Sequence, residues 1–344
     1  MKKTLIIAFM LLAPLAAYCA NGGMKAYAVL NDSILTFYYD NKQGERKGTV
    51  YEIKERYLGT NNYKDVPDWE DKMTKVVFDK TFAGYQPTST AWWFVWSNNL
   101  KDIENMHYLN TSMVTEMNNM FMSCKSLTSL DMSSFDTSNV TDMNRMFLGC
   151  ESLKSLYISS FNTSKVVDMS NIFFGCSSLT NLSLKGFNTS NVTDMSCMFW
   201  GCESLESLEL SCFDTSKVED MCEMFAYCCS LKDLRLKNFN TSNVVDMSFM
   251  FCCCESLMSL DLSCFDTSKV VDMWYMFDGC SSLTTIYAND WNHISSSDSF
   301  SMFKDCPNLC GGKGTKLGVY NCPIDGTAAH IDGGKENPGL FTEK

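Results

Sequence analysis

Histidine is scarce in this chain of 344 residues, and clusters of basic residues are missing. The three histidines, His107, His293 and His330, limit the supply of groups that exchange protons or bind metals near neutral pH. Asp and Glu total 40 against 28 Lys and Arg, which gives a formal net charge of −12. Because a polyanion is attracted to clustered basic surface, no nucleic-acid partner is expected. The same shortages argue against an enzyme, a metal site or a cofactor.

Long apolar runs are also missing, apart from one near the N-terminus. Two lysines precede an apolar stretch from Leu5 to Ala17, and small residues follow it. About 13 residues are too few to span a bilayer, which takes roughly 20, but they fit a secretory signal. We therefore predict a signal peptide over residues 1–20 and an exported mature chain, secreted or at a bacterial cell surface, without a transmembrane segment. Lipidation at Cys19 is the alternative, which Tyr18 disfavours because a lipobox has a small residue there.

The middle of the chain consists of one sequence unit that repeats with a period of 26 residues and no insertions. Phenylalanine recurs at this period from position 121 to 303, cysteine from 124 to 306 and leucine from 127 to 309. A divergent copy lies upstream, where Trp93 and Phe94 precede Ser97 in the cysteine position. Units of this length bury their apolar faces only by stacking, so the period predicts a solenoid.

Each unit, called a coil below, has two apolar patterns. Leu130 and Met132 alternate as in a short strand with one buried face. From Val140 to Cys150 the apolar residues follow a helical spacing, and Gly149 suits the end of a helix. The expected fold class is α/β: a right-handed, leucine-rich-repeat-like solenoid with one short parallel strand and one helix in each coil.

The flanks lack the period and are predicted to cap the two ends of the solenoid. Residues 21–92 form the expected β-rich N-terminal cap, with a hairpin at 26–39 and further strands at 49–53 and 74–79. The repeats occupy 93–310. Residues 311–344 are rich in glycine and are predicted to be a C-terminal cap.

Eighteen cysteines would ordinarily suggest disulfides in an exported protein, but eight of them form one column with the period of the repeat. Neighbouring coils would place their Cα atoms about 5 Å apart, yet parallel Cβ directions suit the torsion of about 90° in a disulfide poorly. Buried thiols are the favoured interpretation, and bridges between coils are the alternative. Cys252, Cys253 and Cys254 lack the CxxC spacing of zinc sites. Cys310 and Cys322 are candidates for one disulfide in the C-terminal cap.

Two surfaces are candidates for binding. The outward positions of the strands form a column of mixed charge, in which Tyr and Arg are the expected anchors. Its members are Asp131, Tyr157, Ser183, Glu209, Arg235, Asp261 and Tyr287. A hydrophilic face that only keeps the protein soluble is the alternative. A second stripe is apolar and comprises Met122, Leu148, Phe174 and Trp200. It is either an exposed site for a partner or for self-association, or part of the core.

The repeat resembles known bacterial sequences. Its LxxLxLxxF pattern resembles leucine-rich repeats, and the unit that begins Phe135-Asp-Thr-Ser-Asn-Val-Thr-Asp-Met143 is similar to the 26-residue repeat of BspA-like surface proteins. The resemblance covers residues 94–310. It implies display on the cell surface and adhesion to host or bacterial proteins.

The expected function is that of a repeat protein, secreted or at the cell surface, which binds an extracellular protein through the solenoid. A carbohydrate-binding protein and a purely structural surface protein are the alternatives. A column of mixed charge favours a protein partner, whereas clustered exposed aromatic residues flanked by Asp and Asn would favour a glycan.

Overall fold

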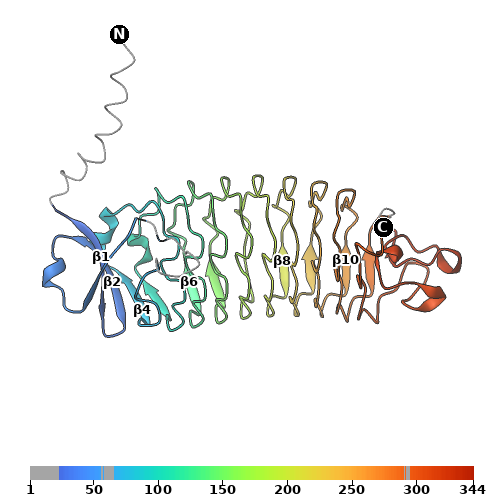
Figure 1. Ribbon diagram of the computed structural model, residues 1–344, viewed down its shortest axis with the longest axis horizontal. Coiled ribbons are helices and arrows are strands. Elements are labelled where there is room, and N and C mark those ends of the chain that lie inside the picture. Colours follow the sequence, from blue (N-terminus) through green and yellow to red (C-terminus); the bar gives the residue numbers. More distant parts are fainter. Residues whose placement is uncertain (1–22, 56, 58–65, 290, 292–294) are drawn as a thin grey trace, which may run out of the picture.

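The computed structural model describes residues 23–55, 57, 66–289, 291 and 295–344. Figure 1 shows a long row of coils between an N-terminal unit that contains a sheet and a loop-rich C-terminal unit. The predicted signal peptide and Cys19 lie outside the described residues. In the part of the chain that is described, no helix has the length and apolarity needed to cross a membrane.

The N-terminal unit is a five-stranded sheet with the order β3-β1-β2-β4-β5. Its strands are β1 (Lys25–Asn31), β2 (Ile34–Asp40), β3 (Thr49–Glu52), β4 (Lys75–Phe78) and β5 (Asp102–Glu104). The β1–β2 hairpin turns at Asp32 and Ser33, where Asp32 has a φ of 52°. The predicted hairpin and the two further strands are therefore present. β5 pairs in parallel with β4 and belongs to the first coil, so the sheet of this unit continues into the repeats.

Short 3-10 helices complete the two end units. They are η1 (Gln43–Glu45), η2 (Lys80–Gly84), η3 (Met106–Tyr108), η4 (Val319–Asn321), η5 (Gly326–Ala328) and η6 (Gly334–Glu336). In the N-terminal unit, the ring of Phe37 packs against Phe78, Phe82 and Trp93 at centroid distances of 4.9–5.6 Å. This aromatic core covers the first coil of the solenoid.

Most coils contribute one strand of three residues on the same side of the stack. These are β6 (Ser129–Asp131), β7 (Ser155–Tyr157), β8 (Ser207–Glu209), β9 (Asp233–Arg235), β10 (Ser259–Asp261) and β11 (Thr285–Tyr287). They pair in parallel as β6-β7, β8-β9 and β10-β11, and β12 (Phe341–Thr342) joins β11. The coil at 181–183 has only an isolated bridge from Ser155 to Asn181. The expected strand is therefore missing from this coil, and the strands that are present do not form one continuous sheet.

The predicted helix in each coil is wrong, because the described coils cross back through a series of turns. Arg145 and Gly149 have φ values of 55° and 71°, and equivalent positive values recur in later coils. Their N–H groups, with that of Phe147 between them, donate to carbonyls of the next coil at 2.6–3.1 Å. An α-helix would use these groups internally. The spacing that suggested a helix comes instead from turns that bury every third or fourth side chain, such as Met143, Met146 and Cys150.

Three buried columns of identical side chains hold the coils together. The phenylalanine rings from Phe94 to Phe303 stack at centroid distances of 5.3–5.9 Å. The hydroxyls of a threonine column donate to a carbonyl 25 residues ahead at 2.8–3.0 Å and accept from the N–H of the same residue at 2.7–2.8 Å. The members are Thr137, Thr163, Thr189, Thr215 and Thr241.

The cysteine column supplies a third link between coils. Each of its eight thiols donates to the carbonyl of the phenylalanine 29 or 30 residues earlier, at 2.9–3.3 Å. Burial raises the pKa of Cys150 and Cys228 to about 12, so these thiols keep the proton that they donate. Ser97 holds this position in the first coil, where its buried Oγ has no partner. Every cysteine in the described part of the chain is a free thiol, as predicted for the column.

The C-terminal residues fold over the last coil. Phe341 pairs with Ile286 through β12 and packs edge-on against Phe303. Asp332 is buried and accepts from the N–H groups of Lys313, Thr315 and Gly334 and from the Thr315 hydroxyl. Burial alone would raise the pKa of this carboxyl, but the hydrogen bonds outweigh it and hold the pKa at about 2. The ionised Asp332 carboxylate therefore holds residues 313–315 and Gly334 together in the C-terminal unit.

Candidate binding surfaces

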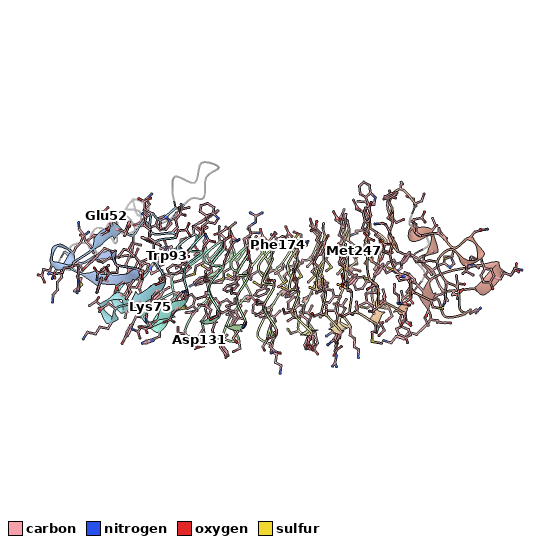
Figure 2. All side chains as sticks on the ribbon, turned by 90° about the horizontal axis from the view of Figure 1, so that it is seen from below. Glu52, Lys75, Trp93, Asp131, Phe174 and Met247 are labelled. Atoms are coloured by element: carbon pink, nitrogen blue, oxygen red, sulfur yellow. The ribbon has the colours of Figure 1, made fainter. Side chains whose placement is uncertain are left out.

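The structure places the predicted charged column along the strand side of the solenoid. Asp131, Glu209 and Arg235 are exposed, and Tyr157 is 56% exposed. Figure 2 shows Asp131 on this side and Phe174 on another. Hydrogen bonds from Ser133 to Asp131 and from Ser211 to Glu209 hold the pKa of each carboxyl below its ordinary value. Both carboxylates are therefore charged at neutral pH.

Part of the column is already paired within the chain. Arg235 lies 3.1 Å from a carboxylate oxygen of Asp233 and 3.8 Å from one of Glu209. Asp261 forms an ion pair with Lys344, and Tyr287 lies half-buried beside β12. Tyr287 is thus a poorer anchor than its place in the repeat suggests, whereas Tyr157 and Arg235 remain accessible.

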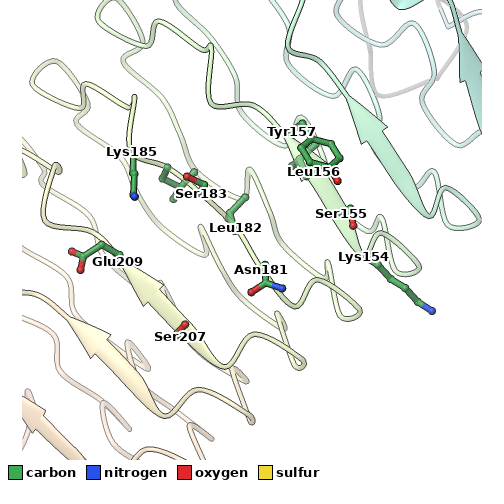
Figure 3. A pocket seen from close by; sticks show the side chains of 11 residues that line it. Lys154, Ser155, Leu156, Tyr157, Asn181, Leu182, Ser183, Lys185, Ser207 and Glu209 are labelled. Atoms are coloured by element: carbon green, nitrogen blue, oxygen red, sulfur yellow. The ribbon is translucent and has the colours of Figure 1, made fainter.

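A groove of about 530 Å³ opens on the strand side where the coil at 181–183 has no strand. Figure 3 shows Tyr157 on β7 and Glu209 on β8 on its two sides, with Asn181, Leu182 and Ser183 between them. Just beyond this segment the chain lies tightly on the preceding coil, since a Cβ added to Gly186 would lie 2.9 Å from the carbonyl oxygen of Ser159. Leu182 is only half-buried, unlike the equivalent leucines of the neighbouring coils.

This groove was missed by sequence reasoning, although the sequence carries a signal for it. The position of Gly186 is occupied by Ser134, Ser160, Cys212, Asn238 and Cys264 in other coils. Glycine allows the close approach that a side chain would block. The change to glycine therefore marks the coil in which the strand is missing.

The apolar stripe lies on the turn side and is half-buried. The rings of Phe174 and Trp200 are stacked at 4.2 Å with an interplanar angle of 6°, and Tyr227 continues the row at 5.1 Å from Trp200. Met122 and Leu148 are also half-buried. Rings that stack across coils contribute to packing, while their remaining exposure leaves an accessible aromatic edge.

A second aromatic group on the turn side was not predicted. The Tyr275 ring lies 5.0 Å from that of Phe249 and 5.6 Å from that of Phe300. Trp274 is 44% exposed and Phe300 57%. These residues occupy different positions of the repeat from Phe174 and Trp200, and only a comparison of every column would have found them.

The described residues offer little reactive chemistry. They contain no group of three or more His, Cys, Asp or Glu side chains arranged to hold a metal ion. Burial raises the pKa of the column thiols, which disfavours the thiolate that a nucleophile needs. The Cys252 thiol donates a hydrogen bond to the Cys253 sulfur at 3.6 Å, and no disulfide joins them. Cys310 and Cys322 are free thiols here, and their pairing stays a prediction.

Stacked coils, most of which contribute one short parallel strand, define a leucine-rich-repeat type of solenoid. Residues 89–208 and 203–312 match the family described as "Mycoplasma protein of unknown function, DUF285". The chain belongs to this family. A search of curated protein sequences found no match.

The solved structures that are similar to this chain include bacterial leucine-rich-repeat proteins. The chain is similar to a leucine-rich cell surface protein of Faecalibacterium prausnitzii, with 19% identity, a TM-score of 0.28 and coverage of 82% of this chain and 91% of that one. A leucine-rich repeat protein of Eubacterium ventriosum has 16% identity and a TM-score of 0.32, and the match covers 86% of this chain and 89% of that one. A chain of a TLR13–ssRNA13 complex has 17% identity and a TM-score of 0.31. This match covers 70% of the present chain but only 39% of the other chain. No function follows from similarities this weak.

Proposed function

We propose that the protein is exported and binds an extracellular protein through the strand side of its solenoid, at the cell surface or after secretion. The observation that carries this proposal is the column of exposed side chains of both signs on parallel strands, with Asp131 and Arg235 at separate points along it. Side chains on such a scaffold are held at fixed spacing, which lowers the entropy cost of binding. The signal-like N-terminus supports export, and adhesion is the use that the family resemblance suggests.

Capture of purified extracellular matrix proteins by immobilised residues 21–344 tests the proposal. The double variant Asp131→Asn with Arg235→Gln removes two charges, while asparagine can still accept the hydrogen bond from the Ser133 N–H. We expect at least a tenfold loss of capture with an unchanged melting temperature. Lys217→Gln is the matched control. This exposed lysine lies in the turn that follows β8, outside the charged column, and its ammonium group contacts Asn191. Equal capture by the double variant, or no capture by the unmodified chain, would refute the proposal.

Export has its own test. Fractionation of cells that express the whole chain, followed by sequencing of the mature N-terminus, should find the protein outside the cytoplasm and beginning near residue 20. An intact N-terminus on cytoplasmic protein would contradict it.

A further inference from the structure

We infer that the groove between β7 and β8 binds a saccharide that carries a carboxylate. The site is a break in an otherwise regular surface. On either side of it, strands pair in register, Ser129 with Ser155 and Ser207 with Asp233. In the coil between, a single bridge at Asn181 replaces the strand. Regular stacking has no need of this break, and the resulting volume lies within the range of small-ligand sites.

The side chains around the groove are of the kind that bind sugars. Tyr157 offers an exposed ring on which the C–H face of a sugar can lie. The hydroxyls of Ser155, Ser183 and Ser207 and the amide of Asn181 supply donors and acceptors for sugar hydroxyls. The Glu209 carboxylate accepts from the Ser211 N–H and has further lone pairs to offer. A ring beside several short polar groups suits a polyhydroxyl ligand.

Charge selects an anionic ligand. Lys154 and Lys185 lie at opposite ends of the groove (Figure 3), and neither forms an ion pair with any residue that the structure describes. Two other strand-side lysines are paired, Lys232 with Glu206 and Lys344 with Asp261. Two unpaired lysines against the single carboxylate of Glu209 leave a positive spot on a chain whose net charge is −12. A carboxylate on the ligand would complete the pairing.

An extended peptide fits this groove less well. Peptides that bind to sheets add a strand to an exposed edge, where backbone groups point to the incoming chain. In a solenoid the backbone N–H and C=O groups of the strands point along the stack, toward the neighbouring coils, and residues 181–183 occupy the space between the facing edges of β7 and β8, so an incoming strand finds no open edge. Buried Leu156 and half-buried Leu182 form the floor, which leaves no deep apolar pocket for an anchor side chain.

Binding of trigalacturonate to residues 21–344, measured by calorimetry and ligand-observed NMR, tests the inference. We expect saturable binding that weakens at least tenfold for the neutral trimer of galactose and for the Lys154→Gln, Lys185→Gln double variant. Tyr157→Ser should also weaken it. Lys232→Gln, an exposed strand-side lysine that does not line the groove, is the matched control and should bind as the unmodified chain does. Added salt should reduce affinity, because the exposed ion pairs are screened.

Three results would overturn the inference. Equal binding of the neutral trimer would remove the role of the lysines, and no binding of trigalacturonate would remove the site. Binding of a blocked triglutamate peptide as tight as that of trigalacturonate, lost in the same variants, would make the groove a peptide site. The melting temperatures of the variants should not change, because the altered side chains are exposed. Protein capture is tested with Asp131 and Arg235, so the two proposals can fail separately.

Discussion

Replacing Thr189 with valine tests the hydrogen bonds that join one coil to the next. Thr189 is 1% exposed, and its Oγ1 donates to the carbonyl of Asp214 at 2.8 Å. The same oxygen accepts from the Asp214 N–H at 2.8 Å. Valine has nearly the shape of threonine but neither a donor nor an acceptor, so both backbone groups of Asp214 lose this partner.

The expected cost follows from the two lost bonds. Each contributes about 1 kcal/mol, and leaving partly buried groups unsatisfied adds to the loss, so Thr189→Val should cost about 2–4 kcal/mol. Thr189→Ser keeps the hydroxyl and removes one buried methyl group, which costs about 1 kcal/mol. Thr128→Val is the control, because Thr128 is exposed; it should change stability by less than about 0.5 kcal/mol.

Urea unfolding followed by circular dichroism measures the loss as a shift in midpoint. A solenoid can unfold in parts, so hydrogen exchange of the Asp214 amide is the local readout. This amide should exchange faster in Thr189→Val and little faster in Thr189→Ser. The reasoning fails if valine is tolerated as well as serine, because the hydroxyl would then add nothing between the coils.

Three further predictions concern other parts of the fold. Without reductant, alkylation should leave the eight column thiols, Cys124 to Cys306, unmodified in the folded protein and modify all of them in denaturant, as counted by mass; disulfides within the column would contradict this. Asp332→Asn should cost about 2 kcal/mol at pH 7, since a folded pKa of about 2 lies below the ordinary 3.8. The stability from Asp332 is present above pH 4 and falls between about pH 4 and 2, so melting temperatures should converge with those of the variant there; a constant difference would refute the sign. Gly175→Ala should cost about 1–2 kcal/mol because its φ is +68°, whereas Gly44→Ala, in open space, should not; equal melting temperatures would show that the left-handed backbone is dispensable.

The burial pattern of the repeat could be predicted because each apolar position has the same neighbours in every coil. Leu130 and Met132 alternate with exposed residues and are buried as expected. The cysteine column could be assigned to buried thiols from the torsion that a disulfide requires, and Ser97 pointed to a small polar group. The thiols of the later coils donate to a carbonyl of the preceding coil. The hydroxyl of Ser97 has no partner, because no coil precedes the first one.

The helix could not be excluded from periodicity, because turns that stack in register also bury every third or fourth residue. The missing information was the sign of the backbone φ angle at each position. Glycine at position 149 suits the end of a helix as well as a left-handed turn, and the other left-handed residue of the coil, Arg145, gives no such signal. Hydrogen bonds to the next coil stabilise this backbone, and a single unit of sequence does not reveal them.

In a chain built from nearly identical coils, function is best sought where a column changes without damage to the core. One position of the repeat carries serine, cysteine or asparagine in the neighbouring coils but glycine, Gly186, in the coil that has no strand. Lys185, which forms no ion pair with a described residue, is next to it. Phe173 and Cys176 in the same coil keep their places in the buried columns. The core therefore holds the coil in register, while its outer segment can differ from the strands of the other coils. A groove formed in this way costs little stability, because the buried columns of the core stay in place beneath it.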